Sequence, residues 1–160
     1  MQLSPLTAVS PIDGRYHKST TPLAAYFSEY ALIKYRLQVE VEYFIMLAEK
    51  KFFSLDAKTK NHLRQLVTDF NIDYAFVIKE TESVTNHDVK AVEYFLKSAL
   101  ENVGLGNLKE WVHFGLTSQD INNTAISRLF HCRSNRLHQN LVTNQMAIKG
   151  LHVTFGLCID

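Results

Sequence analysis

The stretch S-E-Y-A-L-I-K-Y-R-L-Q-V-E-V-E-Y-F-I-M-L, residues 28–47, decides the fold. Its apolar side chains recur at intervals of three and four residues: Tyr30, Leu32, Ile33, Leu37, Val41, Phe44, Ile45 and Leu47. This spacing predicts a helix of about five turns that opens at Ser28 and Glu29. Tyr35, Val39 and Tyr43 widen the apolar face. We therefore expect the helix to pack against more than one neighbour or against a second subunit.

The regions after this stretch are also helical in pattern. Ser54 is predicted to cap a second amphipathic helix, whose inner face carries Leu55, Leu63, Leu66, Val67 and Phe70. A shorter helix is expected from about Asp73 to Glu82, and a clean helical pattern follows Asp88, with Val89, Val92, Phe95, Leu96 and Leu100. No strand-like alternation interrupts these patterns, so the sequence predicts an all-α fold.

Composition limits the possible partners and location. The 17 basic residues nearly balance the 16 acidic ones, which gives no reason to expect a nucleic acid or an acidic membrane surface as partner. No apolar run approaches the roughly 20 residues that a membrane helix needs. The N-terminus lacks the features of a signal peptide, and Cys132 and Cys158 show no metal-ligand spacing. These features predict a cytoplasmic protein without a membrane partner.

A first polar site lies in the loop S-P-I-D-G-R-Y, residues 10–16. Asp13 and Gly14 are typical turn residues. The turn would place the guanidinium of Arg15 beside the phenol of Tyr16. Such a pair could hold a phosphate. The alternative is an ordinary surface turn with a solvated arginine.

A second polar site, Asn86-His87-Asp88, precedes the fourth predicted helix. His87 could donate a hydrogen bond to Asp88 through one ring nitrogen and present the other nitrogen to a ligand. The alternative is a capping cluster with a solvated imidazole. A metal bound by His87, Asp88 and His113 would match no known ligand spacing, so no metal is predicted.

The third polar site lies in W-V-H-F-G-L-T-S-Q-D-I-N-N, residues 111–123. Gly115 lets the backbone turn, and a helix could begin at Gln119 and Asp120. The hydroxyls of Thr117 and Ser118 would then stand beside free backbone N–H groups, an arrangement that suits a carboxylate or a phosphate. The alternative is an ordinary helix N-cap.

Three motifs in this order resemble a known family. T-A-V-S-P-I-D-G-R-Y (residues 7–16), T-N-H-D-V-K-A-V-E-Y-F (85–95) and H-F-G-L-T-S-Q-D-I-N-N (113–123) together resemble the bacterial adenylosuccinate lyases, over roughly residues 1–127. The resemblance implies an all-helical lyase of the fumarase/aspartase superfamily, a homotetramer whose active sites each draw on several subunits. An N-terminal helical domain would span residues 1–110, and the central helical-bundle domain would start within residues 111–160.

The resemblance also implies a reaction and roles for the polar sites. The family eliminates fumarate from adenylosuccinate and from its imidazole-carboxamide counterpart, and no cofactor is implied. Arg15 and Tyr16 match contacts to the nucleotide phosphate. Asn86, His87 and Asp88 match the lining of the substrate pocket, with His87 in a supporting catalytic role. Thr117 and Ser118 match the pair that grips the succinyl carboxylate.

Agreement with the family ends near Arg128. The family's Thr-His segment, which carries the general acid, and its serine loop, which supplies the base, have no counterpart in this sequence. Residues 121–160 hold four Lys or Arg and a single acid, Asp160. We expect a truncation with an altered reading frame, with a natural divergent tail as the alternative. The 160-residue chain by itself is expected to be inactive.

Two other functions stay open from the sequence. One is a non-catalytic helical oligomerisation or nucleotide-binding module that keeps parts of the pocket without turnover. The other is a related lyase that acts on a different succinyl-type substrate, which Arg15 and Tyr16 disfavour because they resemble the contact to a nucleotide phosphate.

Overall fold

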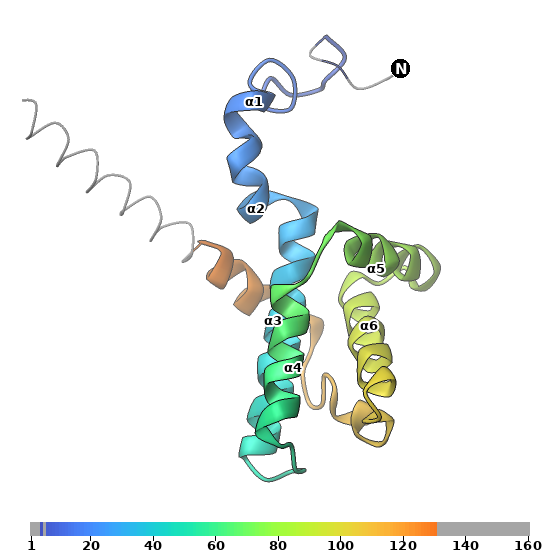
Figure 1. Cartoon of the computed structure of the whole chain (residues 1–160). Coiled ribbons are helices and arrows are strands. Elements are labelled where there is room, and N and C mark those ends of the chain that lie inside the picture. Colours follow the sequence, from blue (N-terminus) through green and yellow to red (C-terminus); the bar gives the residue numbers. More distant parts are fainter. Residues whose placement is uncertain (1–3, 5, 131–160) are drawn as a thin grey trace, which may run out of the picture.

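A computed structural model describes residue 4 and residues 6–130 of the chain. These residues form helices joined by turns and contain no strand, which confirms the all-α prediction (Figure 1). The elements in order are α1 (His17–Thr20), the 3-10 helix η1 (Thr21–Leu23), α2 (Ala24–Phe27), α3 (Glu29–Glu49), α4 (Ala57–Thr68), α5 (Ile72–Thr85), α6 (Asp88–Asn102) and the 3-10 helix η2 (Gly106–Trp111). A further helix begins at Ser118 and includes residues 118–130.

Helix α3 is the central element, as its apolar pattern predicts. Ser28 caps it by accepting a hydrogen bond from the backbone N–H of Ala31 at 3.1 Å. Helices α2, α4, α5 and α6 all contact α3. The expected packing against several neighbours is therefore confirmed.

The boundaries of α4 and α5 differ from the prediction. Asp56, and not Ser54, caps α4, because its carboxylate accepts the backbone N–H of Thr59 at 2.7 Å. Helix α5 continues past Glu82 to Thr85 and ends where Asn86 adopts a left-handed conformation, with φ of 53°. An Asp at the N-cap and an Asn at the C-terminal turn follow ordinary capping preferences.

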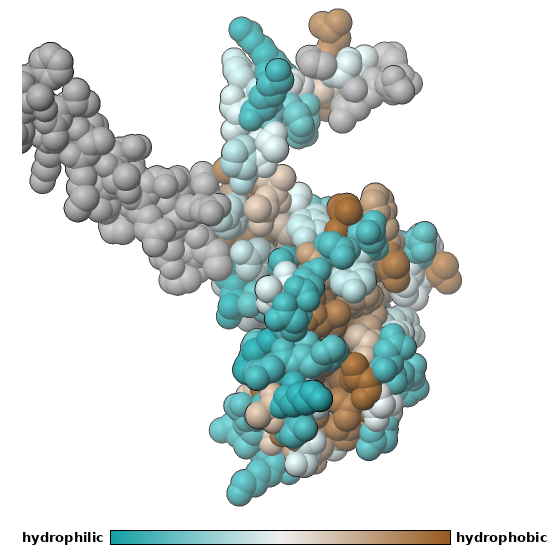
Figure 2. All heavy atoms as spheres, viewed as in Figure 1, coloured by the Kyte–Doolittle hydropathy of each residue, from teal (hydrophilic) through white to brown (hydrophobic). Residues whose placement is uncertain are grey.

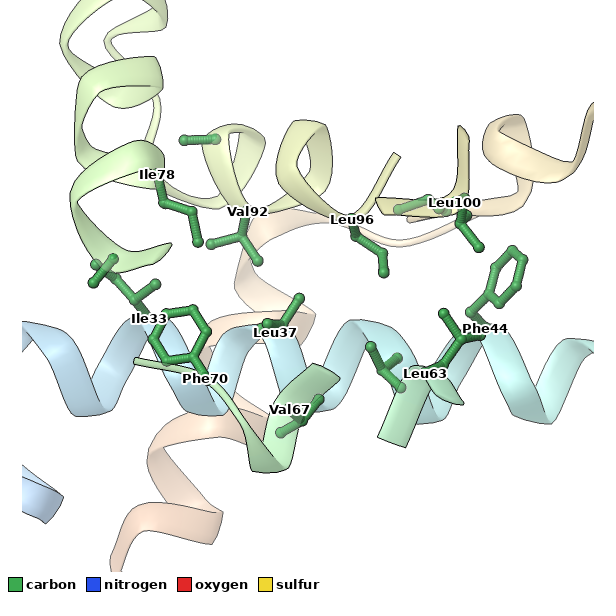
Figure 3. Packing of buried hydrophobic residues seen from close by; sticks show 14 of the residues in the cluster. Ile33, Leu37, Phe44, Leu63, Val67, Phe70, Ile78, Val92, Leu96 and Leu100 are labelled. Atoms are coloured by element: carbon green, nitrogen blue, oxygen red, sulfur yellow. The ribbon is translucent and has the colours of Figure 1, made fainter. Parts of the chain in front are cut away.

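The core lies where α4, α5 and α6 meet α3 (Figure 3). Phe44, at 0% exposure, contributes from α3, Leu63 from α4, Ile78 from α5 and Leu96 from α6. Burial of one such side chain stabilises the fold by about 1.5–3 kcal/mol. Most of the apolar positions that the helical period predicts thus belong to one continuous core.

The segment before α3 stands apart from this core. Figure 1 shows it extending away from α4, α5 and α6, and it carries the exposed Arg15 and Tyr16. Figure 2 shows apolar side chains that reach the surface over α5, where Ile72, Phe76, Val77 and Val84 are exposed. Among the residues that the structure describes, no helix is both long and apolar enough to cross a membrane.

Candidate functional site

Two helix starts, 31 residues apart in the sequence, line an open cavity of about 360 Å³. One is the start of α6, where His87 is the N-cap, and the other is the start of the helix over residues 118–130. Nε2 of His87 lies 3.4 Å from Oγ of Ser118, and both residues line the cavity. The cavity is also lined by Lys90, Glu93, His113 and Thr117. The structure therefore brings the second and third predicted polar sites together.

The orientation of His87 differs from the sequence-based expectation. Its Nδ1 accepts the backbone N–H of Lys90 at 3.1 Å, whereas Nδ1 and the Asp88 carboxylate are 3.9 Å apart, too far for a hydrogen bond. The predicted donation from His87 to Asp88 is therefore wrong. The first turn of α6 has N–H groups that need acceptors, and the imidazole satisfies one of them. In the neutral ring the hydrogen then resides on Nε2, so His87 offers a donor to the cavity.

Asp88 and Asn86 have structural partners. The Asp88 carboxylate accepts the Val89 N–H at 2.8 Å and forms an ion pair with Nη2 of Arg36 at 2.5 Å. Burial acts to raise the pKa of Asp88, but these two donors outweigh it and hold that pKa below its usual value. Asn86 closes α5 by donating its backbone N–H to the carbonyl of Glu82 at 2.8 Å. Neither residue lines the cavity, so their contact with substrate stays a prediction.

Thr117 and Ser118 have different surroundings. The backbone N–H and the hydroxyl of Thr117 both donate to Oδ2 of Asp120 at 2.8 Å, so the acidic side chain three residues on satisfies the N–H at the helix start, which is one half of a capping box. These two bonds hold the pKa of Asp120 below its usual value. The ordinary-cap alternative thus describes Thr117 well. The hydroxyl of Ser118 instead lies beside His87, and the helix starts at Ser118, one residue earlier than predicted.

A pair of side chains that the sequence did not predict includes His113 of the cavity lining. Oε1 of Glu40 lies 2.5 Å from Nδ1 of His113, and Glu40 is 0% exposed. Burial raises the pKa of Glu40, while the hydrogen bond from His113 partly offsets this rise. His113 has a positive φ of 61°, within the turn that leads to Thr117. A signal was present in the sequence, because Glu40 falls on the apolar face between Leu37 and Phe44.

The first predicted polar site lies apart from the cavity. The Arg15 guanidinium is 5.5 Å from the centre of the Tyr16 ring, on the segment that extends away from α6. The described part of the chain therefore does not bring this pair to His87 and Ser118. Within the same residues, no group of three or more His, Cys, Asp or Glu side chains could hold a metal ion, and this includes His87, Asp88 and His113.

Comparisons with known proteins identify the family of this chain. A family model described as Lyase matches residues 14–151. The adenylosuccinate lyase of Dictyostelium discoideum is 52% identical over 133 residues, which cover 79% of this chain and 28% of that protein. The adenylosuccinate lyase of Haemophilus influenzae is 51% identical over 130 residues, covering 77% and 28%, and that of Escherichia coli K12 is 46% identical over 128 residues, covering 77% and 28%.

The extent of these matches bears on the tail of the chain. The chain spans about 28% of the length of the curated relatives it matches. The share of this chain that they cover agrees with the resemblance predicted over roughly residues 1–127, whereas the family model extends past Arg128 to residue 151. The predicted change of character after Arg128 falls almost wholly outside the described residues.

Proposed function

Since the chain belongs to the lyase family, we propose that it forms the N-terminal part of an adenylosuccinate lyase. The reaction would eliminate fumarate from adenylosuccinate to give AMP, and from the corresponding succinyl-aminoimidazole-carboxamide ribotide. In each case a carbon–nitrogen bond breaks and a proton leaves the neighbouring carbon. Identities of 46–52% to proteins named adenylosuccinate lyase support this choice of substrate class.

The observation that supports the proposal most directly is the 3.4 Å approach of His87 Nε2 to Ser118 Oγ. Both groups can donate a hydrogen bond to one oxyanion, and the helix that starts at Ser118 adds free N–H groups and the positive end of its dipole. Loss of a proton next to a carboxylate moves negative charge onto that carboxylate. Donors fixed in place before the reaction stabilise this charge best. We therefore assign the succinyl carboxylate to this cavity.

His113 also lines this cavity. Where Glu40 is ionised, its carboxylate accepts the hydrogen on Nδ1 of His113. That bond fixes the ring plane and leaves Nε2 as the free nitrogen. The two imidazoles are thus held by different partners, His87 by a backbone N–H and His113 by a buried carboxylate.

The proposal also includes a homotetramer that acts in the cytoplasm. Exposed apolar side chains on α5 support association, because large apolar side chains gathered on one surface commonly mark an interaction site. Contact of Arg15 and Tyr16 with the nucleotide phosphate belongs to the same proposal, since the family's active sites draw on several subunits. Sedimentation of the 160-residue chain would show a single tetrameric species if the described part suffices for assembly.

Calorimetric titration of the 160-residue chain with adenylosuccinate and with fumarate tests the proposed function. Wild type should bind both ligands. Ser118→Ala should raise both dissociation constants by about tenfold, because a charge-assisted hydrogen bond contributes about 1.5–3 kcal/mol. Absence of binding by wild type would contradict the proposal. Nucleotide binding that is insensitive to Ser118→Ala would favour the non-catalytic module instead.

Release of fumarate from adenylosuccinate tests the expectation that this chain alone is inactive. A placed acid and base each supply rate factors of about 10²–10⁴, and the resemblance assigns both groups to segments without a counterpart in this sequence. Protein purified free of host enzyme should therefore release no fumarate above the blank. Turnover similar to that of an intact relative would contradict this expectation.

A further inference from the structure

Arg36 is a buried arginine near the middle of α3 that contacts two other helices. It is 4% exposed. Its Nη2 pairs with Oδ2 of Asp88 on α6, and its Nε donates to Oδ1 of Asn122 at 2.9 Å on the helix over residues 118–130. These partners are 52 and 86 residues away in the sequence. One guanidinium therefore joins three helices.

Stability alone gives a poor explanation for this arginine. Burying a guanidinium removes it from water, and only good pairing offsets that loss. Its third nitrogen, Nη1, is buried without a hydrogen-bond partner among the described residues. An apolar side chain at the centre of α3 would avoid this desolvation, so the position favours a geometric role.

The two partners of Arg36 lie close in sequence to the cavity residues His87 and Ser118. Asp88 follows His87, the N-cap of α6, and Asn122 lies one helical turn after Ser118. Arg36, Asp88 and Asn122 do not themselves line the cavity. Because the guanidinium is planar and rigid, its two bonds fix the distance between the helix starts that carry His87 and Ser118.

We propose that Arg36 is a positioning residue that holds His87 and Ser118 at the spacing needed to bind one carboxylate between them. This inference rests on the proposed function for the identity of the ligand, but the spacing itself can be tested without a ligand. Arg36→Lys would keep the positive charge but replace the planar guanidinium with a single ammonium group. That group could not bond to Asp88 and Asn122 with the same fixed geometry.

The experiment compares Arg36→Lys with Arg64→Lys in the 160-residue chain. Arg64 is the matched control because it forms a bidentate pair with Glu42 on the surface, between α4 and α3, away from the cavity. The imidazole nitrogen signals of His87 and the amide signal of Ser118 are followed by NMR without ligand. Fumarate is then titrated into each variant, and melting is followed by circular dichroism.

Arg36→Lys should shift the His87 and Ser118 signals and weaken fumarate binding by about tenfold or more, while Arg64→Lys changes neither. If Arg36→Lys does not fold, Asn122→Ala takes its place, since it removes one of the two bonds and leaves the pair with Asp88. A folded variant with unchanged signals and unchanged fumarate affinity would overturn the proposal. If wild type binds no fumarate, the proposed function fails, and the ligand-free signals still decide the role of Arg36.

Discussion

Glu40 and His113 are 73 residues apart in the sequence, and their side chains meet inside the fold. The contact links the middle of α3 to the turn that leads into Thr117 and Ser118. Oε2 of Glu40 has no hydrogen-bond partner among the described residues, so the carboxylate is only half satisfied. A buried carboxylate with one unpaired oxygen should make the stability of the fold depend on pH.

Glu40→Gln should remove a pH-dependent destabilisation. Burial raises the pKa of Glu40, so the folded state holds this proton more tightly than the unfolded state does. Its contribution to the free energy of unfolding is greatest below the unfolded value of 4.5 and is lost as pH rises through the folded pKa. Wild type should therefore lose stability relative to Glu40→Gln as pH rises, in melts followed by circular dichroism.

Glu101→Gln is the matched control, because Glu101 pairs with Lys109 at 2.7 Å on the exposed surface. An exposed pair contributes little, so this variant should follow wild type across the same pH range. A stability difference between wild type and Glu40→Gln that grows in favour of wild type with rising pH would contradict the argument from burial.

Glu93→Gln should show the opposite pH dependence. Burial acts to raise the pKa of Glu93, but Lys90 at 2.8 Å and Lys97 at 3.0 Å outweigh it and lower that pKa. Its stabilisation is therefore present above the unfolded value of 4.5 and is lost as pH falls through the folded pKa. The variant should lose about 1–3 kcal/mol at neutral pH and much less in acid, as measured by urea unfolding. If Glu93→Gln lost the same stability at neutral and at acid pH, the stabilising role of the ionised Glu93 carboxylate would be contradicted.

Phe44→Ala should destabilise the fold far more than Phe76→Ala. Phe44 is 0% exposed in the core of Figure 3, whereas Phe76 is 63% exposed on α5. Truncation of a buried Phe costs about 3–5 kcal/mol, and a change at an exposed position is usually within about 0.5 kcal/mol. Urea unfolding of both variants measures the difference. Comparable losses would mean that the outer face of α5 is covered in solution.

Local periodicity predicted most of the fold and only part of the site. The helical spacing around Leu37 and Phe44 identified α3 and its core face, because burial of a helix leaves a regular apolar pattern. The chemistry of a helix start likewise identified His87 and Ser118 as neighbours of free N–H groups. These features depend on residues within a few positions of one another.

The supporting pairs could not be found in this way. Arg36 and Asp88 are 52 residues apart, and their contact depends on how α3 and α6 pack. The choice between Asp88 and the Lys90 N–H as partner of His87 also depends on a side-chain rotation that spacing does not determine. An Arg or Glu on an otherwise apolar face, as at Arg36 and Glu40, is the one sequence signal that would have pointed to them.

The last prediction separates capping from ligand binding at two adjacent residues. The Thr117 hydroxyl donates to the Asp120 carboxylate that caps the helix start, so Thr117→Ala should cost about 0.5–2 kcal/mol of stability. Ser118 makes its contact with His87 across the cavity, so Ser118→Ala should leave the melting temperature nearly unchanged. The loss of fumarate affinity should be larger in Ser118→Ala than in Thr117→Ala, because the Ser118 hydroxyl lines the cavity beside His87 and takes no part in the contacts between Thr117 and Asp120. Calorimetry below the melting transition of both variants keeps the two effects apart. If Ser118→Ala instead lowers the melting temperature while fumarate affinity is retained, its hydroxyl is part of the cap, and the carboxylate must be held by His87 and the helix N–H groups alone.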